Sequence, residues 1–423
     1  MSHPGLLPAP RVIPVNVFEN ARQTPLWEQA LYTIWLFAIF MPLDVFQPVR
    51  YLCILAILGI MIVHRKETLP LLAKAWPLFP LSILACFSIF WTPYPASAPK
   101  TAALMLLTPT LLVIMASRLR ASEFLRLTMI AGWLGTLYSV PYFANFADGG
   151  PYAQKNIFAF HMMLVILLSL GTFLNEKEHI ALRLIAAVFV PVTFLFQMMA
   201  DSATSLVFAV AGSAALIGVK VVWGSSSKVR HLRSAALMSL IALALVIVLI
   251  VLSLPDSSLA DRFFALVGKE STFTGRTAIW EAAGRVSAEH PWFGVGVDGF
   301  WNPMTGMAQT LNENDFKPFG TNLTFHSAFW EVRVHLGFAG LAAFIWAIIW
   351  SGTRTVSLWL KDGNLTNSTL LLLFLVIMIS CFTESYSAGS PNMMAYFLYF
   401  GGLAAFGVGE RKFVGVARLV ERP

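Results

Sequence analysis

Gly275-Arg276-Thr277-Ala278-Ile279-Trp280 and His290-Pro291-Trp292-Phe293-Gly294-Val295-Gly296 are two segments of one polar stretch, residues 255–325, in an otherwise apolar chain. Directly after this stretch, His326-Ser327 begins the next apolar run. Ionisable residues are costly inside a membrane, so a membrane protein that concentrates Arg and His in one large loop is expected to carry out its chemistry there. The loop and the apolar runs around it decide the fold.

The composition is that of an integral membrane protein. Of the 423 residues, 57% are hydrophobic and 12% are charged, and the mean hydropathy is +0.71. Because a membrane-spanning helix needs roughly 20 apolar residues, we count twelve candidate spans. They lie near residues 27–46, 48–63, 74–91, 101–117, 123–143, 156–174, 180–200, 203–223, 233–254, 327–350, 368–387 and 390–409. Long apolar runs without strand-like alternation predict an all-α polytopic membrane protein, with short helices in the one large loop.

Lysine and arginine predict the orientation of these helices. They gather in alternate loops and in the C-terminal tail, and short loops rich in these residues face the cytoplasm. We therefore expect a cytoplasmic N-terminal segment (1–26, without a cleaved signal peptide), nine helices within 27–254, an external loop over 255–326, three helices within 327–409 and a cytoplasmic tail over 410–423.

Charge and cysteine usage exclude two kinds of site. The 255–325 loop has five Lys and Arg against eight Asp and Glu, a net charge of −3. Because the whole chain has a net charge of +7, the residues outside the loop have a net charge of +10. That surplus is an orientation signal and a match for anionic inner-leaflet lipid, not evidence for binding of nucleic acid. The three cysteines all lie within predicted spans and show no paired spacing, so no metal or redox motif is present.

Polar side chains within the predicted spans gather at their outer ends. They are Asp44, Lys155, Asn156, His161, Gln197, Asp201, Glu331, Arg333, His335 and Glu384. A single residue of this kind more commonly extends into the lipid headgroups. Because the inner ends offer mostly Lys and Arg, the asymmetry favours a polar cavity that opens to the outer leaflet.

Two residues of the loop are candidates for chemistry. Arg276 begins a helical pattern whose apolar stripe is Ile279, Ala283 and Val286, and we expect this helix to lie along the membrane surface. A guanidinium beside free helix N–H groups suits a phosphate, although an exposed arginine on a surface helix is an equal alternative. His326 at the mouth of a span could remove a proton from a hydroxyl, and the alternative is an interfacial hydrogen-bonding histidine.

Taken together, these segments resemble the O-antigen ligase/polymerase superfamily, and within it the bacterial exopolysaccharide polymerases of the succinoglycan type. The motifs that carry the resemblance are Gly275-Arg276 with Trp280, His290-Pro291-Trp292-Phe293-Gly294-Val295-Gly296, and His326-Ser327 leading into Gly337-Phe338-Ala339-Gly340. The resemblance covers most of the chain. The two glycines of the last motif are expected to allow close helix packing.

Two further segments resemble family signatures. Lys155-Asn156-Ile157-Phe158-Ala159 is similar to the family's Asn-x-x-Ala/Gly signature, and Ser202-Ala203-Thr204-Ser205-Leu206 is similar to its Ser-x-Thr segment. The family often has a basic residue after that serine, where this chain has Ala203. Lys155 is a candidate substitute for it.

The resemblance implies a glycosyltransferase of the C-type membrane fold in the bacterial inner membrane, with its active site at the periplasmic face, no metal ion and no cofactor. The donor would be an oligosaccharide on undecaprenyl diphosphate, and the acceptor a sugar hydroxyl of another lipid-linked repeat. Membrane lipids, a chain-length regulator and export proteins are the partners that such a polymerase would meet, and nucleic acid is not among them.

The resemblance also implies roles for individual residues. Arg276 and His326 would be the catalytic pair: the guanidinium would stabilise the diphosphate leaving group, and the imidazole would activate the acceptor hydroxyl, with inversion at the anomeric carbon. The residues expected to bind substrate or diphosphate are Lys155, Asn156, Arg333 and Glu384. The loop aromatics, which include Trp280, Trp292 and Trp301, suit either stacking on sugars or anchoring in the interface.

Three other functions remain open at this stage. A ligase would use the same chemistry but transfer the polymer to lipid A core. A twelve-span transporter or flippase is a different class, but we detect no internal repeat of the kind common in transporters. A scaffold that only regulates chain length would contain no catalytic site.

Overall fold

The computed structural model describes residues 13–15, 24–152, 154–223, 276–314, 316–321, 323–385, 391–407 and 416–418. The regular secondary structure of these residues is helical apart from two three-residue strands. The α-helices are α1 (Leu26–Phe40), α2 (Gln47–Val63), α3 (Arg65–Lys74), α4 (Pro80–Phe87), α5 (Ala98–Arg118), α6 (Ala121–Ser139), α7 (Lys155–Leu174), α8 (Ile180–Met199), α9 (Ala203–Gly218), α13 (Arg276–Glu289), α14 (Gly306–Asn314), α15 (Ala328–Lys361), α16 (Leu365–Ser380) and α17 (Met393–Ala404). Short helical turns lie at η1 (Asp44–Phe46), η2 (Trp76–Leu78), η3 (Ser88–Phe90), η4 (Val140–Asp148), η5 (Gly150–Tyr152) and η6 (Val219–Trp223). The strands β1 (Ile13–Val15) and β2 (Val416–Arg418) pair antiparallel, with Pro14 opposite Ala417.

The helices have the length and composition of a membrane protein. Within the described ranges, six helical segments are long and apolar enough to cross a bilayer, and four shorter apolar helices accompany them. The predicted all-α membrane fold is therefore confirmed. The predicted span over 233–254 lies outside the described residues, so the total of twelve and the extent of the loop stay predictions.

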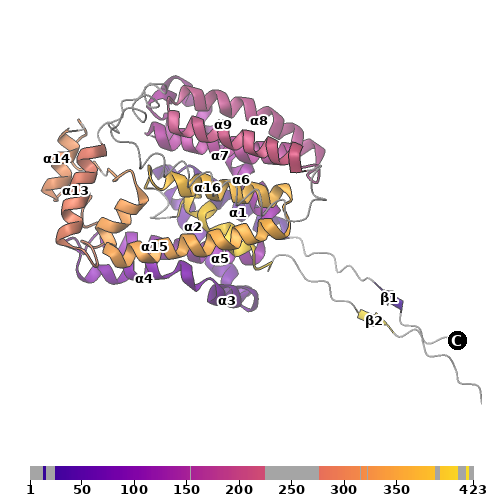
Figure 1. Cartoon of the computed structure of the whole chain (residues 1–423), viewed down its shortest axis with the longest axis horizontal. Coiled ribbons are helices and arrows are strands. Elements are labelled where there is room, and N and C mark those ends of the chain that lie inside the picture. The colour runs from indigo at the N-terminus through magenta and orange to yellow at the C-terminus, as the bar shows by residue number, and fades with distance from the viewer. Residues whose placement is uncertain are drawn as a thin grey trace, which may run out of the picture.

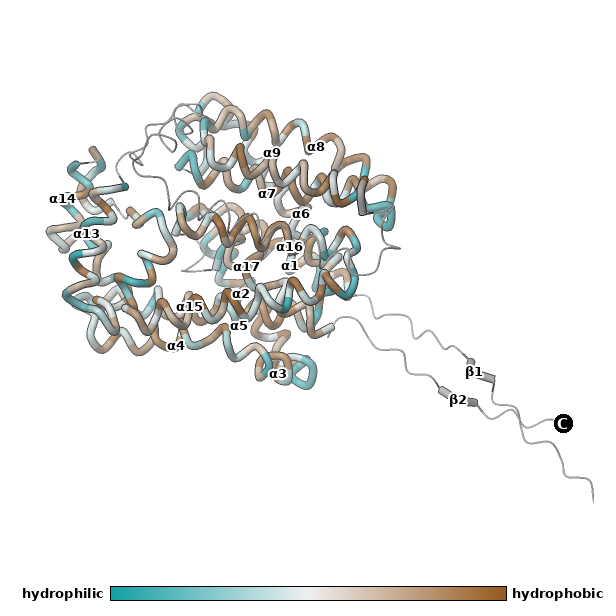
Figure 2. Tube along the Cα trace, in the orientation of Figure 1, coloured by the Kyte–Doolittle hydropathy of each residue, from teal (hydrophilic) through white to brown (hydrophobic). Residues whose placement is uncertain are grey.

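The two ends of the molecule differ. Helices α13 and α14 lie together at one end of the bundle, and the strands β1 and β2 extend from the opposite end (Figure 1). Most of the bundle is coloured as hydrophobic, whereas hydrophilic colour is concentrated on α13, α14, α3 and the helix ends (Figure 2). The predicted periplasmic helices and the two chain ends thus lie on opposite sides of the bundle.

Burial separates the central helix from the outer ones. The apolar window of α7 is 83% buried, whereas those of α8, α9 and the segment 44–63 are each 22% buried. Protein side chains therefore surround α7, while α8, α9 and α2 leave most of their apolar surface open, as helices that face lipid do. The main core follows from this arrangement, with Phe158, Met162 and Leu164 of α7 fully or almost fully buried.

A second, smaller core lies under α13 and α14. The predicted stripe of α13 (Ile279, Ala283, Val286) is buried there, against Phe300, Trp301, Phe325 and Val334. The helical pattern is confirmed over Arg276–Glu289. The stripe nevertheless packs on protein rather than along a membrane surface, because the turn before α15 and the loop after α13 supply enough aromatic surface to cover it.

Helix α15 is broken at Gly337, where φ is +64° and ψ is −160°. The break frees two carbonyls before it and two N–H groups after it, and the segment 291–296 pairs with all four. The hydrogen bonds are Val295 N–H to Val334 O (3.0 Å), Gly296 N–H to His335 O (2.8 Å), Phe338 N–H to Pro291 O (2.9 Å) and Ala339 N–H to Trp292 O (3.1 Å). A backbone break at membrane depth is tolerated when protein groups satisfy it in this way. Gly337 was expected to allow close packing between helices. In the structure it instead breaks α15 and leaves room for the backbone of the loop 291–296.

Candidate functional site

Glu384 lies between Arg276 and His326. Its Oε1 is 3.5 Å from Nη2 of Arg276, and its Oε2 is 3.7 Å from Nδ1 of His326. Glu384 is 8% exposed, and neither Glu384 Oε2 nor His326 Nδ1 has a hydrogen-bond partner within the part of the chain that the structure describes. Arg276 and His326, which are far apart in the chain, thus converge on the carboxylate of Glu384. We call these three residues the Glu384 cluster.

The turn before α15 fixes His326 in place. His326 has φ +48°, a left-handed conformation that is uncommon and strained for a residue other than Gly, Asn or Asp. Both of its neighbours are anchored: Phe325 N–H donates to Glu331 Oε2 (3.0 Å), and Ser327 N–H donates to Ser385 Oγ (3.1 Å). Backbone strain of this kind persists only where surrounding contacts hold it, and it is common at functional sites.

Helix α13 is attached to the same turn. The indole N–H of Trp280 donates to the carbonyl of Phe325 at 2.8 Å, one helical turn after Arg276. On the other side, Ala328 N–H donates to the carbonyl of Glu384 at 3.0 Å. Because α13, the start of α15 and the end of α16 are joined at one place, Arg276, His326 and Glu384 are held close together.

The cluster has the groups for proton transfer next to a fixed cation. If the Nδ1–H of His326 points at Glu384, the other ring nitrogen, Nε2, carries a lone pair that can accept a proton. The guanidinium of Arg276 neutralises the buried carboxylate, which would otherwise be costly. The side chains of His326 and Arg276 are 25% and 19% exposed, so both can be reached by a substrate.

Arg333 lies in the loop attachment instead. Its guanidinium donates to the carbonyl of Pro291 at 2.6 Å and lies over the ring of Phe338 at 3.4 Å. Among the described residues, no hydrogen bond or ion pair joins Arg333 to the Glu384 cluster. It lines an open, mostly apolar hollow of about 440 Å³ together with Trp280, Ser327, Phe329, Trp330, Leu341, Phe382 and Thr383.

Lys155 and Asn156, at the start of α7, form a second polar group with the turn between α8 and α9. Lys155 Nζ is 3.2 Å from Asp201 Oδ2, and Ser202 Oγ donates to Asn156 Oδ1 at 3.3 Å. The two segments that resemble family signatures, 155–159 and 202–206, therefore contact each other. No hydrogen bond or ion pair within the described ranges connects this group to Arg276 or His326.

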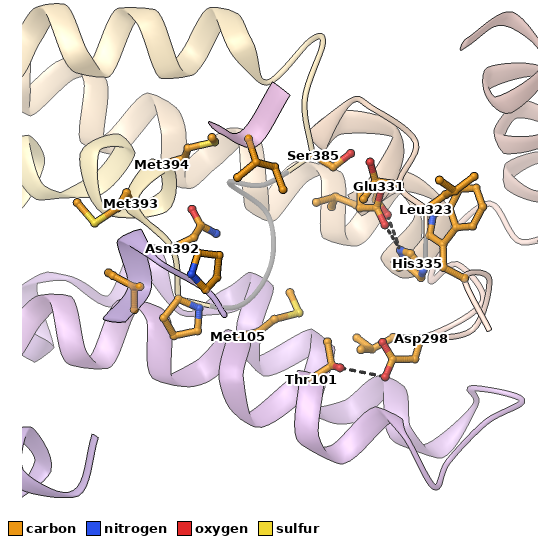
Figure 3. Close-up of a pocket in the computed structure, with 18 of the residues that line it drawn as sticks. Thr101, Met105, Asp298, Leu323, Glu331, His335, Ser385, Asn392, Met393 and Met394 are labelled. Atoms are coloured by element: carbon orange, nitrogen blue, oxygen red, sulfur yellow. Dashed lines mark hydrogen bonds and ion pairs between the residues drawn. The ribbon is translucent and has the colours of Figure 1, made fainter. Parts of the chain in front are cut away.

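A partly open cavity of about 370 Å³ lies on the other face of α15. Glu331 and His335 of α15 line it, with His335 Nδ1 3.5 Å from Glu331 Oε1. Facing them, Asp298 accepts a hydrogen bond from Thr101 at 2.9 Å (Figure 3). Its other lining residues are Ile39, Pro42, Met105, Ile157, His161, Val297, Trp301, Leu323, Thr324, Val332, Leu336, Ser385, Pro391, Asn392, Met393 and Met394.

Asp298, Thr101 and Asn392 are not among the site residues predicted from the sequence. One local signal was available for Asp298, which stands in Gly296-Val297-Asp298-Gly299 and has φ +56°. Asp tolerates such a turn better than most residues. Nothing local marks Thr101 or Asn392, since their place in the cavity depends on how α5 and α17 pack.

Comparison with known proteins gives two matches. Residues 186–345 match the family model described as O-antigen ligase, a range that includes Arg276, His326 and Arg333. The chain is also 24% identical over 299 residues to the exopolysaccharide production protein ExoQ of Rhizobium meliloti (strain 1021), over 67% of this chain and 66% of the relative, so it spans slightly less than two thirds of that protein. Both matches agree with the resemblance inferred from the motifs: the chain is similar to the O-antigen ligase family over residues 186–345 and to an exopolysaccharide production protein over most of its length.

Proposed function

We propose that this protein polymerises exopolysaccharide repeat units at the periplasmic face of the inner membrane. It would transfer a glycan from undecaprenyl diphosphate to a sugar hydroxyl of a second lipid-linked repeat, without a metal ion and with inversion. The observation that carries this proposal is the convergence of Arg276 and His326 on Glu384. The superfamily supports a ligase or polymerase type of function in general, and the reaction details are our inference.

In the proposed reaction the acceptor hydroxyl gives its proton to Nε2 of His326 while its oxygen attacks the anomeric carbon of the donor sugar. The bond from that carbon to the diphosphate oxygen breaks, and the diphosphate leaves with the electron pair. Arg276 stabilises the developing charge, which is greatest at the moment of bond breaking. Glu384 keeps the imidazole oriented and stabilises it once it is protonated.

The contact between Arg276 and Glu384 supports this sequence of events. At 3.5 Å it is longer than the 2.7–2.9 Å typical of a charge-assisted hydrogen bond. A guanidinium has five N–H donors, so Arg276 can keep Glu384 on one side and bind a phosphate oxygen on another. Lys155 and Asn156 are proposed to contact the diphosphate or its glycan at the second polar group.

A ligase is the second candidate, because the matching family model is described as O-antigen ligase. The similarity to an exopolysaccharide production protein favours the polymerase. Both reactions use the Glu384 cluster in the same way and differ in the acceptor.

Glycan analysis of a deletion strain, with and without the gene restored, distinguishes these functions. A polymerase predicts that polymer is lost while single lipid-linked repeats accumulate. Free polymer that is no longer attached to a surface lipid would instead indicate a ligase. Purified protein in detergent should convert lipid-linked repeats to longer chains; if it cannot, while the deletion strain retains polymer, the proposed enzyme activity is wrong.

A further inference from the structure

The cavity of about 370 Å³ behind α15 differs from the Glu384 cluster in its chemistry. Two carboxylates (Asp298 and Glu331) and two imidazoles (His161 and His335) line it, and none of the lining residues that the structure describes is Lys or Arg. A diphosphate placed there would meet negative charge without a compensating cation, which is unfavourable. Carboxylates and imidazoles instead accept hydrogen bonds from hydroxyl groups.

Trp301 adds an independent observation. It is 7% exposed and lines the cavity, and its indole N–H has no hydrogen-bond partner in the described part of the chain. A buried donor without a partner costs free energy, so a ligand oxygen at this position would be favoured. Asp298 likewise uses only Oδ2 in its bond with Thr101. The lining of one cavity thus includes a donor without a partner, the indole N–H of Trp301, and an acceptor oxygen of Asp298 that the bond with Thr101 does not use.

The size of the cavity fits a small hydroxylated ligand. Its volume of about 370 Å³ lies within the roughly 300–1,000 Å³ of small-molecule sites. The apolar part of its lining, with Met105, Leu336 and Met394, can cover the faces of a sugar ring. The open hollow on the opposite side of α15, lined by Trp280, Trp330 and Phe382, is more apolar and suits the lipid of the donor.

The cavity is connected to His326 by short contacts. Glu331, on its wall, accepts a hydrogen bond from Phe325 N–H and interacts with the hydroxyl of Ser385. The same hydroxyl accepts a hydrogen bond from Ser327 N–H. Both neighbours of His326 are therefore tied to the wall of the cavity.

We propose that this cavity is the acceptor subsite and binds a neutral sugar residue of the acceptor glycan, with Asp298 and Trp301 as its hydrogen-bonding groups. The assignment to the acceptor rests on the proposed glycosyl transfer. The binding of a neutral glycan does not, because it needs neither the diphosphate nor Arg276. Glu331 is a positioning residue for the turn at His326, so it is left unchanged in the test.

The test is a binding measurement on the purified full-length protein in detergent. The probe is the oligosaccharide repeat released by mild acid from the lipid-linked intermediates of the source cells, since this treatment removes lipid and diphosphate. We expect the wild-type protein to bind it, and Asp298→Asn and Trp301→Phe each to bind about tenfold more weakly. Sodium pyrophosphate should not compete for this binding.

Matched controls are Asp148→Asn and Trp27→Phe, which change the same residue types at exposed positions and should bind like the wild type. Unchanged thermal unfolding of the Asp298 and Trp301 variants would show that they fold. Equal binding by all variants, no binding by the wild type, or competition by pyrophosphate would each overturn the sugar subsite.

Turnover separates this inference from the proposed function. In a polymerisation assay, Asp298→Asn should raise the acceptor KM about tenfold and change kcat little. If polymer forms but the acceptor KM is unchanged, the subsite assignment alone is wrong. If the glycan binds as expected but the wild-type protein makes no polymer, the proposed reaction is wrong and the cavity remains a glycan site.

Discussion

Glu384 is the residue on which the candidate site depends, because its single carboxylate approaches both a base and a cation. The side chain is almost completely buried, so its charge needs compensation from within the protein. Arg276 supplies that compensation at one oxygen, and His326 faces the other. Any change to one member should therefore alter the electrostatics of the other two.

Replacement of His326 by alanine should reduce polymer formation by at least about 100-fold, because general base catalysis contributes 10²–10⁴-fold. Chain elongation by the purified protein would be followed with lipid-linked repeats as substrate. His290→Ala is the matched control, since His290 belongs to the same loop and its side chain is exposed. A fully active His326→Ala protein would exclude this residue as the base.

Replacement of Arg276 by alanine should lower kcat by about 10²–10³-fold, which is the usual cost of removing one charge-stabilising group. Arg276→Lys should recover only part of this loss, because an ammonium lacks the planar fork of a guanidinium. Arg285→Ala provides the control on the same helix, at an exposed position. Equal loss in both alanine variants would mean that the helix, not the Arg276 charge, is responsible.

At the scale of an element, the break in α15 provides the attachment point for the loop 291–296. The helix needs a residue that can adopt positive φ at position 337, and the loop 291–296 pairs with the backbone groups that the break frees. Without that pairing, unsatisfied groups would remain inside the helical bundle. The His-Pro-Trp-Phe-Gly motif is therefore a structural clamp, and Arg333 reinforces it through the carbonyl of Pro291.

Gly337→Ala should destabilise the protein by more than the 1–3 kcal/mol typical of a strained backbone alone. An added Cβ would also collide with the backbone carbonyl of Trp292. Thermal unfolding in detergent would measure the effect. Gly59→Ala, in α2 with nothing near its added Cβ, should leave stability unchanged or raise it slightly. Similar melting curves for the two variants would contradict the clamp.

At the scale of the whole molecule, the two ends of the bundle have different tasks. At the end that bears the chain termini, Arg118 pairs with Glu28 (2.9 Å) and Glu67 (2.6 Å) and so connects α1, α3 and α5. At the other end lie α13 and α14 (Figure 1), and Arg276 of α13 belongs to the Glu384 cluster. This separation supports the proposal that the termini are cytoplasmic and the candidate site is periplasmic.

Accessibility to a membrane-impermeant maleimide tests this orientation. In intact spheroplasts, Glu289→Cys at the end of α13 should react, whereas Lys177→Cys between α7 and α8 should react only after the membrane is disrupted. Both positions are exposed. The unsubstituted protein should show little labelling, because Cys53 and Cys381 are buried and Cys86 is half-buried. Labelling of Lys177→Cys in intact spheroplasts would reverse the proposed topology.

Patterns of neighbouring residues were sufficient to predict the helices and the family resemblance. The apolar runs predict the helices, because each span is set by consecutive residues. The helix α13 and its buried stripe also follow from helical spacing within one segment. The family resemblance rests on short motifs that can be read in place.

Other features could not be read in this way. The break at Gly337 requires the partner loop, and the same glycine is equally compatible with an unbroken packed helix. The Glu331–His335 pair follows from helical spacing, but its place on a cavity wall opposite Asp298 does not (Figure 3). Arg333 has the charge expected of a residue that binds phosphate. Only its contacts with Pro291 and Phe338 show that it holds the loop 291–296 against α15.

The sequence by itself determined that this is a helical membrane protein that resembles the O-antigen ligase/polymerase superfamily, because hydropathy and short motifs are properties of neighbouring residues. Only the tertiary structure decided that Arg276 and His326 meet at Glu384, which is 108 positions from Arg276. It also decided that a carboxylate-lined cavity lies behind the turn at His326. Convergence of this kind depends on how α13, α15 and α16 pack, and no local pattern encodes that packing.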